Sequence, residues 1–261
     1  MAAVPQVLPA GDNRLMSDAM RITAGMTLVW DVDDVLNQLT RAWFEQAWLS
    51  THPDCPVTES AQLTENPMHR LLGVTREEYL ASLDAFRAAG YAALVPDADI
   101  LAWMSRNGDK FRHVALTAVP LASASCSGEW IYRHWGRWIR SIHVVPSPRT
   151  GQEAPSWDAS KVEYLRWFGH ADVVLIEDNP VACAAAVAAG FSALRVPQPW
   201  NRGTALPKVG ALSDLLNCEY AAADAAGRFG EGEVGGAAAA ITGRCQSPRH
   251  SRAAVPQVTR K

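Results

Sequence analysis

The segment TLVWDVDDVLN, residues 27–37, joins an apolar run to three closely spaced aspartates, Asp31, Asp33 and Asp34. Apolar runs of this length are typical of buried strands, whereas buried carboxylates are costly unless they are paired or bind a metal. A buried strand that ends in such a cluster therefore indicates a site in which the negative charge is used.

Further apolar runs alternate with segments of helical periodicity along the chain. The apolar runs span residues 112–118, 141–145, 172–178 and 191–196, and the helical segments span residues 97–108, 127–140, 158–168 and 179–190. Short apolar runs are typical of strands buried on both faces of a parallel sheet. Strands that alternate with helices of this length predict right-handed βαβ units. The sequence therefore predicts an α/β fold with a doubly wound (Rossmann-like), mainly parallel sheet.

One long interval interrupts this alternation directly after the first strand. Between Asn37 and the helix that opens at residue 97, the segments 38–49 and 76–90 both have helical periodicity. Ligands of open α/β sheets bind beyond the carboxyl ends of the strands, and an insert at this point would cover them. We therefore expect a small helical cap at residues 38–95.

The chain is expected to have four parts. These are a loose N-terminal leader at 1–24, a discontinuous α/β hydrolase core at 25–37 plus 96–215, the cap at 38–95, and a disordered tail at 220–261. Alanine and glycine fill 14 of the 20 positions from 221 to 240, and a basic stretch follows. We expect disorder there because too few apolar side chains remain to offset the entropy of ordering.

The bulk composition excludes several classes of protein. The 261 residues carry a net charge of −3, with 48% hydrophobic and 20% charged residues. This is typical of a globular chain, and it gives no case for specific nucleic-acid binding. No apolar run is long enough to span a membrane, and the first twenty residues do not resemble a signal peptide. Five scattered cysteines without a CxxC pair indicate reduced thiols, so we expect a cytoplasmic protein.

The predicted strand ends gather residues suited to phosphate chemistry. Thr117 lies at the end of the second strand, Glu177 and Asp178 end the fourth, and Lys161 opens the helix before it. Converging carboxylates favour a cation, and carboxylate, carbonyl and water oxygens are the ligands of Mg²⁺. Such a site attracts phosphate, whose oxygens Lys161 and Thr117 are suited to hold. An aspartate such as Asp31 can then act as a nucleophile through an aspartyl-phosphate.

These residues, in this order, resemble the motifs of the haloacid dehalogenase (HAD) superfamily of phosphatases and phosphotransferases. The superfamily pattern is an apolar strand followed by DxDx(T/V), a strand ending in Ser or Thr, a lysine, and an apolar strand ending in acids. The chain matches it with Asp31-Val32-Asp33-Asp34-Val35, with Thr117 in VALTA, with Lys161, and with Glu177 and Asp178 in LIEDN. DxD alone is a weak signal, but four elements in this order, within residues 26–200, are specific.

The resemblance implies catalytic and metal-binding roles for the acidic residues. Asp31 is implied to be the nucleophile and a ligand of Mg²⁺. Asp33 is implied to be the general acid and base, with its backbone carbonyl on the metal. Asp178 is implied to be the third protein ligand, and Glu177 is implied to support the metal shell directly or through water.

The resemblance also implies a phosphate-binding set. Thr117 and the backbone amide of Ala118 are implied to hold the phosphoryl oxygens, and Lys161 to neutralise both these oxygens and the nucleophile. The helical insert matches the place of the superfamily's small cap, which closes over the substrate.

Within the cap, Arg41, Trp43 and Phe44 are the candidates for substrate specificity. Asp34 departs from the superfamily pattern, which often has a small residue there. We expect Asp34 to be a solvated turn residue, with a contact to substrate as the alternative.

The sequence thus predicts a magnesium-dependent phosphomonoester hydrolase that acts on a small phosphorylated metabolite. A phosphomutase or phosphotransferase of the same superfamily, or a 5'-nucleotidase-like activity, is the alternative. A receiver-like domain fits less well, because its phosphorylated aspartate lies on a middle strand and its lysine on the last strand. A non-catalytic binding protein is disfavoured because Asp31, Asp33, Lys161 and Asp178 are all present.

Overall fold

The structure is a computed structural model that describes residues 22–153, 156–218 and 220. All of these residues belong to one compact unit of the chain, Met1–Ala223. Most of the predicted leader and tail therefore lies outside the described residues. No helix in the described part of the chain is both long and apolar enough to cross a membrane.

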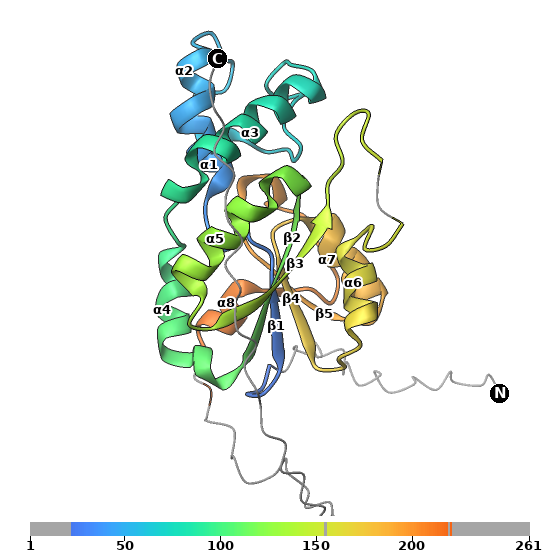
Figure 1. Ribbon diagram of the computed structural model, residues 1–261. Coiled ribbons are helices and arrows are strands. Elements are labelled where there is room, and N and C mark those ends of the chain that lie inside the picture. The colour runs from blue at the N-terminus through green and yellow to red at the C-terminus, as the bar shows by residue number, and fades with distance from the viewer. Residues whose placement is uncertain (1–21, 154–155, 219, 221–261) are drawn as a thin grey trace, which may run out of the picture. The chain divides into compact units, whose positions relative to one another are not determined.

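In the described part of the chain, six parallel strands form one sheet in the order β3-β2-β1-β4-β5-β6 (Figure 1). The strands are β1 (Thr27–Trp30), β2 (Arg112–Val119), β3 (Ile139–Pro146), β4 (Val173–Glu177), β5 (Ser192–Arg195) and β6 (Gly210–Ala211). This topology confirms the predicted doubly wound α/β fold. The sequence did not predict β6, because two residues are too short to form a recognisable apolar run.

Helices cover both faces of the sheet, which explains why its strands are apolar without alternation. One face packs against α4 (Ala98–Asn107), α5 (Ala124–Trp135) and α8 (Leu212–Leu216), and the other against α6 (Lys161–Phe168) and α7 (Pro180–Ala188) (Figure 1). In β1, Leu28 and Trp30 belong to the first core and Val29 to the second. Burial on both sides fixes β1 at the centre of the sheet, so the acidic residues that follow it have a rigid base.

Some helices begin where the sequence carries a capping residue. The side chain of Asn179 accepts hydrogen bonds from the backbone of Val181 and Ala182 at the start of α7, as its sequence predicts. The prediction of a helix over 127–140 is partly wrong, because α5 ends at Trp135. The chain from Ile139 onward pairs with β2 instead, and this tertiary pairing overrides the helical spacing of Trp138.

The insert after β1 is helical, as predicted. It contains α1 (Leu39–Trp43), the π-helix η1 (Phe44–Trp48), α2 (Leu49–Thr51), the 3₁₀ helices η2 (Ser60–Gln62) and η3 (Tyr91–Ala93), and α3 (Arg76–Gly90). Its two ends meet where Asn37 and Pro96 form an antiparallel bridge. In Figure 1, α1 to α3 lie beyond the carboxyl ends of the strands. Three further 3₁₀ helices lie in the core: η4 (Gly108–Lys110), η5 (Leu121–Ser123) and η6 (Pro199–Asn201).

A hydrogen-bonded pair anchors the end of β1 to β2. The indole nitrogen of Trp30 donates to Nδ1 of His113 over 3.0 Å, and Nε2 of His113 donates to the carbonyl of Gly108 over 2.8 Å. Burial lowers the pKa of His113 to about 4, so the ring stays neutral and can serve as donor and acceptor at once. This arrangement fixes the residue that directly precedes Asp31.

Candidate active site

The predicted site residues converge at the carboxyl end of the sheet, beside the junction of β1 and β4. The chain order of the strands reverses there, because β2 and β3 lie on one side of β1 and β4 to β6 on the other. A cleft of about 690 Å³ opens at this point. Its lining includes Asp31, Asp33, Asp34, Thr117, Ala118, Lys161, Glu177 and Asp178. The structure therefore brings together every catalytic, phosphate-binding and metal-binding residue that the sequence singled out.

Lys161 joins two of the carboxylates. Its Nζ lies 2.7 Å from Oδ1 of Asp31 and 2.6 Å from Oε2 of Glu177, and the lysine side chain is 9% exposed. Ser160 caps the helix that begins at Lys161 by accepting from the backbone of Glu163. Burial works to lower the pKa of Lys161, but the two carboxylates outweigh it and raise the pKa. The ammonium group is therefore charged and shared between the two acids.

The carboxylates of Asp31, Glu177 and Asp178 form a buried oxygen cluster. Each offers one oxygen, and these oxygens lie within 4.8 Å of one another. Burial, and then the charge of Glu177, raise the pKa of both Asp31 and Asp178 well above the ordinary range. With one ammonium group beside three carboxyl groups, the fully ionised form of the cluster is therefore unfavourable unless a further cation binds. A set of carboxylate oxygens that needs a cation fits Mg²⁺ in chemistry and in charge.

Glu177 and Asp178 are oriented by further hydrogen bonds. Oε1 of Glu177 accepts from the backbone amides of Asp178 and Asn179, over 3.1 and 3.0 Å. Oδ2 of Asp178 accepts from the indole nitrogen of Trp200 over 2.9 Å. Trp200 was missed by the sequence analysis, because it lies in η6, beyond β5, and carries no local signal for this contact. It positions one of the candidate metal ligands.

The two oxygens of Asp31 differ in their contacts. Oδ1 accepts from Lys161 and, over 2.8 Å, from the backbone amide of Val32. Oδ2 makes no hydrogen bond to any residue that the structure describes. One oxygen is thereby fixed and the other is left available, which suits a nucleophilic carboxylate.

Asp33 is held by residues of the helical insert. Its Oδ2 accepts from Nε and Nη2 of Arg87 over 3.3 and 3.1 Å, and its Oδ1 accepts from the hydroxyl of Tyr91 over 2.5 Å. Helical periodicity predicted a helix over Arg76–Gly90, but it did not indicate which of its residues reaches the core. Arg87 and Tyr91 are therefore contributions to the site that only the tertiary structure reveals.

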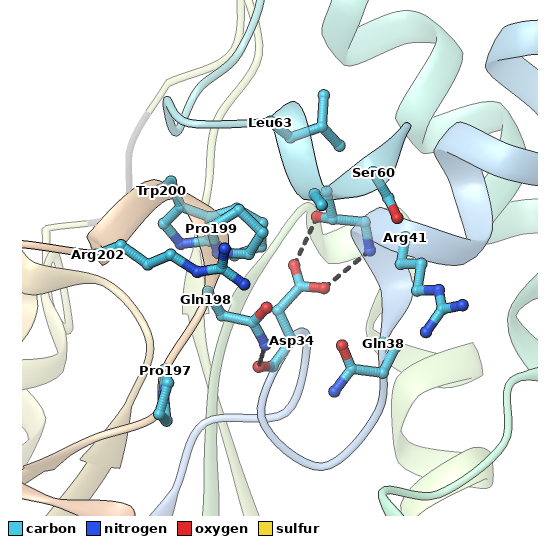
Figure 2. A pocket seen from close by; sticks show the side chains of 12 residues that line it. Asp34, Gln38, Arg41, Ser60, Leu63, Pro197, Gln198, Pro199, Trp200 and Arg202 are labelled. Carbon is cyan, nitrogen blue, oxygen red and sulfur yellow. Dashed lines mark hydrogen bonds between the residues drawn. The ribbon is translucent and has the colours of Figure 1, made fainter. Parts of the chain in front are cut away.

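Asp34 is buried, so the expectation of a solvated turn residue is wrong. Its side chain accepts from the backbone amide and the hydroxyl of Thr40 over 2.8 and 2.5 Å, and its carbonyl accepts from Gln198 over 2.6 Å (Figure 2). Its φ of 64° turns the chain sharply after Asp33, in a region that aspartate tolerates better than most residues. Asp34 therefore ties the turn after β1 to the first helix of the insert and to the segment after β5.

Asp34→Asn is expected to reduce the pH dependence of stability. Burial raises the pKa of Asp34 to about 7, against about 3.9 in an unfolded chain. Its protonation therefore stabilises the fold fully below about pH 4, and this stabilisation is lost as the pH rises through 7. Over that range the wild type should lose roughly 1.4 kcal/mol per pH unit relative to the variant. Urea titrations near pH 5 and pH 8 measure this; an equal difference at both values would contradict it.

The structure places the three specificity candidates of the cap away from the cleft. Arg41 is largely exposed, pairs with Glu45 over 3.0 Å, and lines a separate pocket of about 220 Å³ (Figure 2). Trp43 and Phe44 are fully buried in the core, and the indole nitrogen of Trp43 donates to Ser82. Trp43 and Phe44 cannot contact a substrate because they are buried, and Arg41 lines a pocket other than the cleft.

Most of the cap residues that line the cleft belong to α3, and Thr40, Asn66 and Pro67 complete this side. Helix α3 presents residues at the spacing of one helical face. These residues are Arg76, Tyr79, Leu80, Leu83 and Arg87. The helical spacing of these residues is visible in the sequence of the predicted helix. The sequence does not show, however, that this face of the helix points to the cleft.

Comparisons with known proteins gave likenesses among solved structures. No protein-family model and no curated protein matches the chain. A predicted phosphatase from Clostridium acetobutylicum is 16% identical, covers 75% of this chain and 98% of its own, and has a TM-score of 0.49. A haloacid dehalogenase-like hydrolase from Streptococcus pneumoniae is 16% identical, covers 74% of this chain and 90% of its own, and has a TM-score of 0.47. The second description names the superfamily that the motif order resembles; at these values the functional proposal depends on the site itself.

Proposed function

We propose that the chain is a magnesium-dependent phosphomonoester hydrolase of the HAD type, which acts on a small phosphorylated metabolite through an aspartyl-phosphate. One observation carries this proposal: Lys161 lies between Asp31 and Glu177, with Asp178 beside them, at the carboxyl end of a parallel sheet. This arrangement provides a nucleophilic carboxylate, a fixed cation for phosphoryl oxygens and a set of oxygen donors for a metal.

In the first step, Oδ2 of Asp31 attacks the phosphorus atom of the ester. A bond forms between this oxygen and phosphorus, the bond from phosphorus to the ester oxygen breaks, and Asp33 donates a proton to the leaving oxygen. Thr117, the backbone amide of Ala118 and Lys161 hold the phosphoryl oxygens, where negative charge develops. The products are the free alcohol and an aspartyl-phosphate on Asp31.

In the second step, water attacks the phosphorus atom of the aspartyl-phosphate. Asp33, now ionised, takes a proton from the water, and the bond between phosphorus and Asp31 breaks. Inorganic phosphate leaves, Asp31 is again a free carboxylate, and Asp33 is again protonated. The same residue therefore serves as acid and then as base, and the enzyme returns to its initial state.

The oxygen cluster defines the residues for the metal. Asp31, Asp178 and the backbone carbonyl of Asp33 are the proposed ligands, with Glu177 in support. When bound, Mg²⁺ neutralises negative charge on the transferred phosphoryl group. The protein itself orients the ligands, through Lys161 at Asp31 and Glu177 and through the indole of Trp200 at Asp178.

A phosphate-release screen tests the proposal. The full chain is incubated with a panel of phosphomonoesters that includes sugar phosphates, nucleotides and aryl phosphates, once with Mg²⁺ and once with EDTA. We expect release of inorganic phosphate from part of the panel with Mg²⁺ and none with EDTA. Transfer of the phosphoryl group to a second hydroxyl without phosphate release would instead indicate a mutase. A folded protein that turns over no ester would contradict the proposal.

Mg²⁺ is also expected to stabilise the fold. A ligand that binds only the folded state adds RT ln(1 + [L]/Kd), about 2.7 kcal/mol at a hundredfold excess over Kd. The measurement is the urea midpoint with Mg²⁺ and with EDTA, which requires no turnover. Asp178→Asn should lose most of this shift because it removes one ligand charge, whereas Asp99→Asn, at an exposed position, should keep it. An equal shift in both variants would contradict the assignment of the metal ligands.

A further inference from the structure

We propose that Arg87 and Tyr91 of the helical insert are positioning residues for Asp33, and that they leave Oδ1 as the oxygen that exchanges the proton with the leaving group. This inference rests on the proposed function, because it assigns the acid and base role to Asp33. It assigns a part of the site to residues that lie 54 and 58 positions away in the sequence.

The contacts of the two oxygens of Asp33 are unequal. Oδ2 receives two donors from Arg87, Nε at 3.3 Å and Nη2 at 3.1 Å. Because a carboxylate oxygen has two lone-pair directions, Oδ2 is fully occupied. Oδ1 receives the hydroxyl of Tyr91 at 2.5 Å, and the amide of Asn37 only at 3.5 Å, the outer limit for a hydrogen bond. Oδ1 thus keeps one direction for the leaving oxygen, while the other contacts fix the plane of the carboxylate.

Arg87 is itself held on its far side. Its Nη1 donates to Oδ1 of Asp84 over 3.0 Å, and Asp84 is bound by two nitrogens of Arg149, at 2.6 and 2.8 Å. These contacts form a series that runs from Asp33 through Arg87 and Asp84 to Arg149. Asp33 follows β1 and Arg149 follows β3, so the series begins and ends on the core. Its middle members belong to α3 of the insert.

The charges in this series of contacts alternate, and the groups are largely buried. The exposed fractions of the side chains are 12% for Asp33, 9% for Arg87, 25% for Asp84 and 18% for Arg149. The two arginines are balanced by two aspartates, so the series of contacts is suited to hold a carboxylate and not to capture a second phosphate. Arg87 can reach Asp33 only while α3 is packed on the core. The orientation of the acid and base therefore depends on the seating of the insert.

The test compares two aryl esters that differ in their need for an acid. Phenyl phosphate requires protonation of its leaving oxygen, whereas p-nitrophenyl phosphate releases a stabilised phenolate without it. In Tyr91→Phe and Arg87→Lys, kcat/KM for phenyl phosphate should fall by about ten- to a hundredfold, and kcat/KM for p-nitrophenyl phosphate much less. Because kcat/KM reports steps up to the release of the leaving group, base catalysis in the second step does not affect this comparison.

Matched controls are available on the surface. Tyr132→Phe and Arg133→Lys make the same chemical changes on α5, where both side chains are exposed, and should leave both rates unchanged. Equal losses for the two esters in the Tyr91 and Arg87 variants would indicate a merely structural role and overturn the inference. Wild-type rates in both variants would overturn it as well.

A crystal structure of Tyr91→Phe provides a readout that does not require turnover. We expect the carboxylate of Asp33 to rotate about its terminal torsion once the hydroxyl donor at Oδ1 is gone, so that the contacts of Oδ2 with Arg87 shift as well. An unchanged carboxylate would contradict the positioning role. The proposed function fails separately, when the wild type releases no phosphate from any ester or when Asp31→Asn remains active.

Discussion

Asp31→Asn is expected to abolish phosphate release while the protein stays folded. The amide is not a nucleophile, so the aspartyl-phosphate cannot form, and losses for a covalent nucleophile are on the order of 10⁴- to 10⁶-fold. The size and shape of the side chain are preserved, and the residue can still accept from Val32 and Lys161 at Oδ1. The loss therefore reports chemistry and not a change of fold.

The same substitution is expected to stabilise the metal-free protein at neutral pH. Burial and the charge of Glu177 raise the pKa of Asp31 well above that in an unfolded chain, against the opposing effect of Lys161. The protonated form of Asp31 therefore stabilises the folded state. This stabilisation is fully present below about pH 4, the pKa in an unfolded chain, and is lost as the pH rises through the raised pKa of the folded state. A neutral amide does not incur this loss, so the variant should unfold at a higher urea concentration than the wild type in EDTA.

Two measurements decide this prediction. Phosphate release is assayed with Mg²⁺ on the substrates found by the screen, and urea unfolding is followed in EDTA near neutral pH. Asp54→Asn serves as the control because its side chain is exposed, and it should change neither quantity. Activity that survives in Asp31→Asn would exclude Asp31 as the nucleophile.

Lys161→Met is expected to cause the largest loss of stability. The thioether fills part of the space of the lysine but removes the only ammonium group between Asp31 and Glu177 among the described residues. Removing one partner of a buried ion pair typically costs about 3–5 kcal/mol, because the remaining charge is left without compensation. The variant should also lose about 10²- to 10³-fold in activity, since it no longer holds the phosphoryl oxygens.

The loss in Lys161→Met should grow with pH in the absence of metal. Burial acts to raise the pKa of Glu177, but Lys161 and the hydrogen bonds to the carboxylate outweigh it and hold the pKa below its ordinary range. Without the ammonium group, the pKa of Glu177 should therefore rise, and the raised pKa of Asp31 should rise further. Stability that depends on their protonation is lost as the pH rises, so the deficit should be larger near pH 8 than near pH 5. Lys208→Met, at an exposed position, is the control and should change stability by less than about 0.5 kcal/mol. A deficit that does not increase with pH would contradict this account of the site.

Much of the candidate site could be predicted because its residues lie at the ends of strands or at the first position of a helix. The apolar runs predicted β1 to β5, and the carboxyl ends of parallel strands meet at one edge of the sheet. Asp31, Thr117 and Asp178 were therefore expected to lie close together before any contact was known, and one cleft contains all three. The spacing of Trp138 misled the prediction of α5, because strand pairing between β2 and β3 was stronger than the helical pattern.

The sequence by itself determined the strands, the capped helices and the acids that follow β1 and β4, because these features depend on periodicity and on hydrogen bonds between near neighbours. Only the tertiary structure decided the partners of those acids. Arg87 reaches Asp33 from 54 residues away, and Gln198 reaches Asp34 from 164 residues away. Such contacts depend on how remote elements pack against one another, and no local pattern encodes that. The same packing buried Asp34, whose neighbours along the chain had indicated a solvated turn.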